Sequence, residues 1–220
     1  RSELSLEMLE NFNPCFVLDL TATPKKESNI ISYVDAVQLK NEHMVKLPVI
    51  VYNRDSQSEV LIDAIDLRNK LEEIASAEYT KTGKYIRPIA LFQAQPKGKE
   101  DATTFEKLRD KLVDAGIPAE QIAIRTADVN ELKNTDLMSP TCPIRYIITV
   151  NALKEGWDCP FAYILASLAN KTSQVDVEQI LGRILRLPHT SQHTQSALNM
   201  SYVLTSSNDF NNLSLIHISE

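Results

Sequence analysis

The chain has 220 residues, of which 43% are hydrophobic and 24% are charged, a composition typical of a folded protein with a full apolar core. Its formal net charge of -6 excludes a strongly basic coat, so any contact with nucleic acid must come from a local patch. Three widely separated cysteines argue against a disulfide framework or a zinc site and favour a reducing cytoplasm, and no apolar run approaches the roughly 18 residues of a membrane span.

The first part of the chain predicts one strand and a connector. An apolar run at 15–20 is followed by the loop sequence TATP and predicts a buried strand. Residues 25–46 are polar and mixed, and they predict a connector with a short strand or helix. The chain opens at Arg1 rather than at Met, so we expect it to be a piece of a longer protein.

Strands and helices are predicted to alternate beyond the connector. Apolar or β-branched runs predict strands at 49–52, 88–92, 121–125, 146–150, 163–166 and 200–205. Helical spacing of apolar residues predicts helices at 57–82, ended by Gly83, at 103–115 and at 173–187. This alternation indicates parallel βαβ units, and therefore an α/β sheet with helices on both faces. Ligands of such sheets bind at the carboxyl ends of the strands.

The sequence VEQILGRILRLP carries the strongest signal for chemistry. On a helix, Gln179, Arg183 and Arg186 are spaced i, i+4, i+7 and share one face, which Gly182 borders. Neither arginine has an acid three or four positions away, and a planar guanidinium suits a phosphate. The glycine suggests that something approaches the helix backbone closely. The alternative is a solvated basic stripe on an amphipathic helix.

Two further motifs follow predicted strands. In ITVNALKEGWDCP, Gly156 lets the backbone approach a ligand, and Asp158 can accept hydrogen bonds from a ribose hydroxyl or from a neighbouring arginine. The alternative is a turn that these residues merely shape. In LTATP, the hydroxyls of Thr21 and Thr23 can relay hydrogen bonds between loops, although such residues are common at strand exits.

Several signatures of other functions are missing from the sequence. It has no GxxxxGK[ST] phosphate loop and no Pro-Asp dipeptide of a nuclease site. His189 and His193 have i, i+4 spacing but lack a third ligand, so we predict no metal site there.

The four segments LTATP, IALFQAQ, ITVNALKEGWDCP and VEQILGRILRLP resemble motifs III, IV, V and VI of superfamily-two helicases, in order and spacing. The last two are most similar to the restriction subunits of type III restriction enzymes, and the resemblance covers about 15–210. It implies a RecA-like α/β fold, with the end of a first lobe at 1–24, a connector at 25–55 and a second lobe at 56–212. Residues 213–220 resemble an adaptor-derived tail, and we exclude them from the fold.

The resemblance also implies a role for each motif. Arg183 and Arg186 would act as arginine fingers beside Gln179, while Gly156, Asp158 and Gly182 would line the nucleotide cleft. Contacts with DNA, or coupling of the nucleotide state to DNA, would come from Thr21, Thr23, Gln93, Thr149 and Asn151.

The sequence departs from the family pattern at two positions. Many members have a threonine where this chain has Val150, so Thr149 or Asn151 would contact the DNA phosphate instead. Many also have an arginine where this chain has Ile180, which leaves two arginines in motif VI.

The cofactors implied are ATP and Mg²⁺, bound mainly by the first lobe, so we expect this chain alone to be inactive. The partners implied are DNA, the first helicase lobe and a nuclease domain in the same polypeptide, and a methyltransferase modification subunit. Membrane attachment is not implied. Two alternatives stay open: a stand-alone, repair or type I-like translocase, and a non-catalytic nucleic-acid-binding scaffold lobe.

Overall fold

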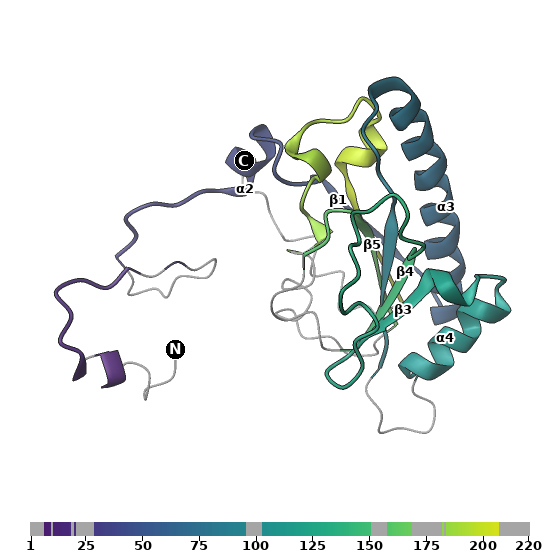
Figure 1. Cartoon of the computed structure of the whole chain (residues 1–220), viewed down its shortest axis with the longest axis horizontal. Helices are drawn as coiled ribbons and strands as arrows, with labels where there is room; N and C mark the ends of the chain where they lie inside the picture. Colours follow the sequence, from purple (N-terminus) through teal and green to yellow (C-terminus); the bar gives the residue numbers. More distant parts are fainter. Residues whose placement is uncertain are drawn as a thin grey trace. The chain divides into compact units, whose positions relative to one another are not determined.

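A computed structural model describes residues 7–9, 11–18, 20, 29–95, 103–150, 158–168, 182 and 184–206 of the chain. The chain divides into two compact units, 1–34 and 35–220. The second unit contains a six-stranded sheet and the helices that cover it (Figure 1).

The first unit corrects one prediction. Residues 15–18 and 20 form no strand and are exposed, where we expected a buried strand at 15–20. Phe16 exposes 69% of its surface and Leu20 exposes 92%. A strand needs a neighbour for its backbone polar groups and its apolar side chains. No described residue of this unit belongs to a strand ladder. Thr21 and Thr23 lie outside the described residues.

The second unit begins with a short capped helix. Helix α2 (Ala36–Asn41) starts at Asp35, whose carboxylate accepts from the amide of Gln38 at 2.7 Å, while the Gln38 side chain accepts from the amide of Asp35 at 3.1 Å. This reciprocal pair is a capping box and explains why so short a helix forms. Strand β1 (Val49–Asn53) follows within the range expected to be a connector, and it pairs with the last strand of the sheet.

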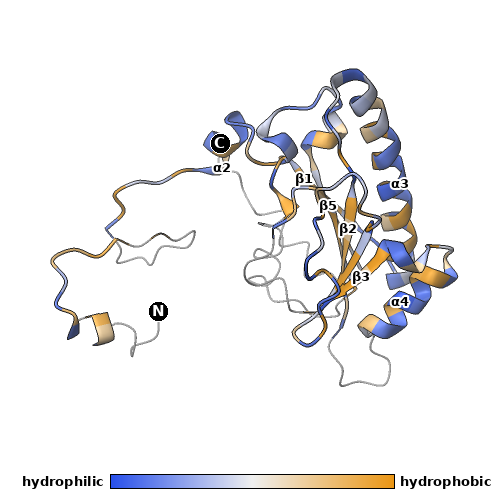
Figure 2. Cartoon of the chain, in the orientation of Figure 1, coloured by the Kyte–Doolittle hydropathy of each residue, from blue (hydrophilic) through white to orange (hydrophobic). Residues whose placement is uncertain are grey.

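All neighbouring strands of the sheet are parallel, in the order β1-β6-β5-β2-β4-β3. The other five strands are β2 (Ile89–Gln93), β3 (Ile122–Arg125), β4 (Tyr146–Thr149), β5 (Ala162–Ser167) and β6 (Ser201–Thr205). Each predicted strand beyond the connector is confirmed, with its ends displaced by a residue or two. Every residue of β2 and β5 is buried, because a central parallel strand is covered on both faces. Figure 2 shows the apolar residues gathered on these strands.

The two long helices lie on one side of the sheet (Figure 1). Helix α3 (Gln57–Thr82) contacts β2, β5 and β6, and α4 (Phe105–Asp114) contacts β4. Gly83 ends α3 in the left-handed conformation, at a φ of 71°, as its position in the sequence predicted. None of the described helices is long and apolar enough to cross a membrane.

Within the connection from β5 to β6, Ser196–Asn199 contacts α3. Within the predicted helix 173–187, Gly182 and Ile184 are helical, and Ile184 is buried in the core. The helix does not extend to residue 187, because Arg186 forms an antiparallel bridge with Val45. The prediction that Arg186 lies on the helix face is therefore wrong.

Short 3-10 helices lie at Ala119–Gln121, Pro188–Thr190 and Ser196–Asn199.

Candidate functional site

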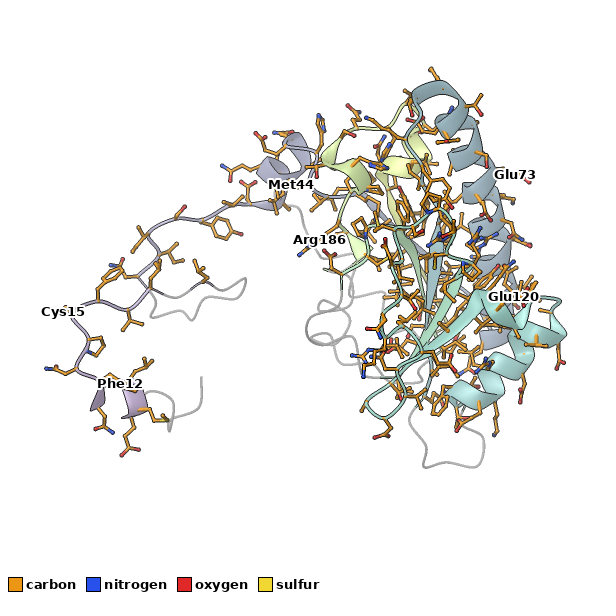
Figure 3. All side chains as sticks on the ribbon, in the orientation of Figure 1. Phe12, Cys15, Met44, Glu73, Glu120 and Arg186 are labelled. Atoms are coloured by element: carbon orange, nitrogen blue, oxygen red, sulfur yellow. The ribbon has the colours of Figure 1, made fainter. Side chains whose placement is uncertain are left out.

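A short backbone bridge positions Arg186. The amide of Lys46 donates to the carbonyl of Leu185 at 2.5 Å, and the amide of Leu187 donates to the carbonyl of Met44 at 3.0 Å. Arg186 stands between these two hydrogen bonds, and Figure 3 shows it next to Met44. The backbone of Arg186 is thus held by the segment that leads into β1, rather than by the helix that precedes it.

The side chain of Arg186 forms an ion pair with Asp158. Nη1 of the guanidinium donates to Oδ2 of the carboxylate, and the two side chains are 61% and 44% exposed. The sequence left open whether Asp158 faces a ribose or a neighbouring arginine, and in the structure its partner is Arg186. An exposed ion pair of this kind contributes about 0–1 kcal/mol, so another anion can replace the carboxylate at little cost.

Lys46, a buried lysine, forms hydrogen bonds to the backbone on both sides of this ion pair. Lys46 is fully buried, and its Nζ donates to the carbonyl of Pro160 at 2.8 Å and to the carbonyl of Arg186 at 2.6 Å. The same atom lies 4.4 Å from the centre of the Tyr163 ring, in cation–π geometry. Burial lowers the pKa of Lys46 to about 7. Sequence reasoning missed this residue, although a lysine inside the apolar run VKLPVIV is a signal that could have found it.

The ion pair lies at the end of the sheet where β1, β5 and β6 begin. Asp158 precedes β5, and Lys46 precedes β1. Ser201, the first residue of β6, donates from its hydroxyl to the carbonyl of Ile184 at 3.3 Å. Arg186 and Asp158 therefore sit by the amino ends of β1, β5 and β6, whereas the general rule for parallel sheets points to the carboxyl ends.

A separate polar cluster occupies the carboxyl ends of three adjacent strands. The register places Gln93 between Thr149 and Ser167, and the Ser167 hydroxyl donates to the side-chain carbonyl of Gln93 at 3.1 Å. The hydroxyl of Thr149 is buried and has no hydrogen-bond partner among the residues that the structure describes. The side-chain amide of Gln95, a residue that the sequence did not single out, donates to the carbonyl of Leu168 at 2.9 Å. Gln93 and Thr149, predicted to act together, are thus neighbours.

The remaining predicted site residues are not all described. Residues outside the described part of the chain are Thr21, Thr23, Asn151, Gly156, Gln179 and Arg183. Gly182 is described and exposed, and a Cβ atom added to it would meet nothing within 4 Å. We interpreted this glycine as allowing a close approach to the backbone, and no described residue makes that approach.

Glu78, a buried acid in α3, holds the stretch of chain after Arg186 through hydrogen bonds to Thr194. The carboxylate of Glu78 accepts from the amide of Thr194 at 3.0 Å and from its hydroxyl at 2.6 Å. His193 lies beside it, and Nδ1 of the ring is 3.7 Å from Oε1 of Glu78. Burial lowers the pKa of His193 to about 4, so the ring is neutral at pH 7. Within the described part of the chain, no three His, Cys, Asp or Glu residues are grouped so as to hold a metal ion.

No protein-family model and no curated protein matches the chain. Among solved structures, the chain is similar to the fragment structure of a putative HsdR subunit of a type I restriction enzyme from Vibrio vulnificus YJ016. The TM-score is 0.57 and the identity 17%, over 95% of this chain and 43% of that one. The two chains share their fold. This chain spans less than half the length of the fragment that it matches. The likeness and the parallel sheet confirm the predicted α/β, RecA-like fold.

The chain is also similar to the ATP-dependent Type ISP restriction-modification enzyme LlaBIII bound to DNA. That comparison has a TM-score of 0.43 and 18% identity, over 79% of this chain and 13% of the enzyme.

Proposed function

We propose that this chain is the second motor lobe of an ATP-driven DNA translocase of the restriction-enzyme kind. The observation that carries the proposal is the exposed guanidinium of Arg186, held on a fixed backbone bridge and paired with an acid that another anion can replace. The order of the helicase-like motifs and the RecA-like fold support it. In this proposal the lobe comprises 56–212, preceded by the end of a first lobe at 1–24 and a connector at 25–55.

Arg186 would contribute charge stabilisation during phosphoryl transfer. The first lobe would bring ATP against this face, and the guanidinium would leave Asp158 for the γ-phosphate oxygens, where negative charge spreads in the transition state. Arg183 would act as a second finger beside Gln179, and Gly156, Asp158 and Gly182 would line the cleft. The residues fit the phosphate side of a nucleotide, but the chain has no phosphate loop. Mg²⁺ bound by the first lobe would neutralise charge on the β- and γ-oxygens.

DNA contacts would come from the carboxyl edge of the sheet. Gln93 and Thr149 are adjacent there. Asn151 would extend this patch, and Thr21 and Thr23 would couple it to the nucleotide state. Contacts to phosphates position a protein on DNA without reading its sequence, so this lobe should bind DNA of any sequence.

Two classes of parent enzyme fit the chain. The amino-acid sequences of motifs V and VI favour a type III restriction subunit. Such a subunit would have a nuclease domain in the same polypeptide and a methyltransferase subunit as its partner. The likeness to a putative type I HsdR subunit favours a type I-like translocase instead. The nuclease motif encoded beside this lobe distinguishes the two. In either class we propose a cytoplasmic protein, because its cysteines form no disulfide framework.

The test replaces Arg186 in the full-length protein. Arg186→Ala should cut DNA-stimulated ATP turnover by about a hundred-fold or more, because losing an arginine finger removes transition-state stabilisation. Circular dichroism should show an unchanged fold, since an exposed ion pair adds little stability. Arg109→Ala is the matched control. Arg109 forms an ion pair with Glu131 at 3.1 Å, both side chains are 36% exposed, and the pair touches neither Arg186 nor Asp158.

A folded Arg186→Ala protein with near-normal turnover would overturn the proposal and favour the non-catalytic scaffold lobe.

A further inference from the structure

We infer that Lys46 is a positioning residue for Arg186 and fixes where the guanidinium stands relative to a bound phosphate. The inference deepens the proposed function and rests on it, because the position of Arg186 matters for turnover only if that residue meets the nucleotide. Lys46 belongs to none of the helicase-like motifs in the sequence.

One atom of Lys46 holds both sides of the ion pair. Its Nζ donates to the carbonyl of Arg186 at 2.6 Å and to the carbonyl of Pro160 at 2.8 Å. Pro160 stands two residues after Asp158, so the backbones that carry the guanidinium and the carboxylate are tied to the same nitrogen. A change at Lys46 would therefore alter the position of Arg186 relative to Asp158 and to any phosphate that replaces it.

The surroundings confine the side chain of Lys46 to one position. It is fully buried, and the Tyr163 ring covers Nζ on a third side, 4.4 Å from the ring centre. Tyr163 is itself fixed by its hydroxyl, which donates to the carbonyl of Leu198 at 3.0 Å. The backbone of Lys46 is held as well, by the 2.5 Å hydrogen bond from its amide to Leu185. A side chain held on this many sides is preorganised, and preorganisation is what a catalytic arginine requires.

Lys46 also connects Arg186 to the chain that enters the lobe. It lies after α2 and just before β1, at the end of the segment expected to join the two lobes. In a near-attack geometry, a misplacement of about 1 Å can cost about a hundred-fold in rate. A shift of the segment that leads into β1 would therefore displace the guanidinium of Arg186. The backbone bridge between Val45 and Arg186 and the hydrogen bond from the Lys46 Nζ would transmit the movement.

Arg87 provides a matched control inside the same fold. It too is a fully buried cation that precedes a strand, and its guanidinium donates to the carbonyls of Ser139 at 2.7 Å and Leu137 at 2.5 Å. It also lies over an aromatic ring, 5.9 Å from the centre of Phe161. Its hydrogen bonds reach neither Arg186 nor Asp158. Replacing Arg87 therefore tests what loss of a buried cation does to the fold alone.

The experiment compares Lys46→Met and Arg87→Met in the full-length protein. Both should lower the midpoint of thermal unfolding. Lys46→Met should also lower kcat for DNA-stimulated ATP hydrolysis about ten-fold or more per folded molecule, with a smaller change in the KM for ATP. Arg87→Met should leave kcat within about two-fold. Equal losses of kcat in the two variants would overturn the inference, and so would an unchanged kcat in Lys46→Met. If Lys46→Met does not fold, Lys46→Gln, one bond shorter, takes its place.

A double variant separates this inference from the proposed function. If Lys46 acts through Arg186, adding Lys46→Met to Arg186→Ala should lower turnover by less than about two-fold more, because the group that Lys46 positions is already gone. A full ten-fold further loss would show that Lys46 acts independently and would overturn the inference alone. If Arg186→Ala by itself keeps normal turnover, the proposed function fails first, and the inference fails with it.

Discussion

At the scale of single residues, two neighbouring cations of this site are in opposite environments. Arg186 is 61% exposed on its side chain, whereas Lys46 is fully buried. Burial disfavours the charged amine, which is why the pKa of Lys46 falls to about 7. A neutral amine still has two hydrogens for its two carbonyl acceptors, so losing the proton leaves both hydrogen bonds intact.

The first prediction concerns stability and pH. The pKa of Lys46 is about 7 in the fold, against 10.5 for an unperturbed lysine. At pH 8 the unfolded chain therefore binds more protons at this residue than the folded one, and the free energy of unfolding should rise with pH. We expect a rise from pH 7 to pH 9, measured by urea denaturation.

Lys46→Met should flatten this rise, because methionine does not titrate. The window stops at pH 9 because burial raises the pKa of Cys159 to about 11, from 9.0 for an unperturbed thiol, and this group lowers the free energy of unfolding as the pH rises above 9. A rise of equal slope in the variant would assign the effect to another group.

The second prediction concerns the chemistry of the charge at Arg186. Arg186→Lys should rescue little of the turnover lost in Arg186→Ala, because an ammonium is a point charge and cannot reproduce the bidentate fork of a guanidinium. Steady-state ATPase with saturating DNA measures this. A lysine variant with more than about half of normal turnover would mean that net charge alone suffices, and that Arg186 does not grip two oxygens.

The sequence could name the chemical groups of the site but not their arrangement. Asp158 and Arg186 stand out by type and by motif, and Asp158 was expected to face either a sugar or an arginine. The position of the pair at the amino edge of the sheet depends on the bridge between Arg186 and Val45. That bridge joins distant parts of the sequence and has no local signal. Lys46 was missed for the same reason, since only its tertiary partners reveal a role.

At the scale of elements, α3 shows what local signals can define. Ser56 caps its first turn by accepting from the amide of Glu59 at 3.2 Å, and Gly83 closes its last turn. Both ends are set by residues inside or next to the helix, and the predicted range 57–82 is confirmed. The predicted strand at 15–20 and the end of the predicted helix at residue 187 failed, because each depends on pairing with a distant segment.

The third prediction follows from the left-handed conformation of Gly83. A Cβ atom added there would meet nothing within 4 Å, so the cost of Gly83→Ala is conformational and not steric crowding. We expect a loss of about 1 kcal/mol in the free energy of unfolding, measured by urea denaturation. Gly83→Asn is the control and should lose less, because asparagine tolerates this conformation better. Equal losses in both variants would argue against the conformational explanation.

At the scale of the whole molecule, the proposed division of labour gives a fourth prediction. In the proposed function the chain supplies an arginine finger, but its sequence has no phosphate loop to cradle the β- and γ-phosphates. The purified chain alone should hydrolyse ATP no faster than background, with or without DNA. A DNA-stimulated signal that survives further purification and disappears in Arg186→Ala would contradict the proposed two-lobe site.

The strand order has a consequence for biosynthesis. Among the strands that the structure describes, β1 leaves the ribosome first, yet its partner in the sheet is β6, which leaves last. Until β6 emerges, β1 has no ladder to join, and β5 presents an open edge to other nascent chains. Contacts between such distant segments close slowly. A polypeptide that terminates before Ser201 would keep both edges open, and we expect it to aggregate or to need a chaperone, whereas one that reaches residue 206 can form the six-stranded sheet described here.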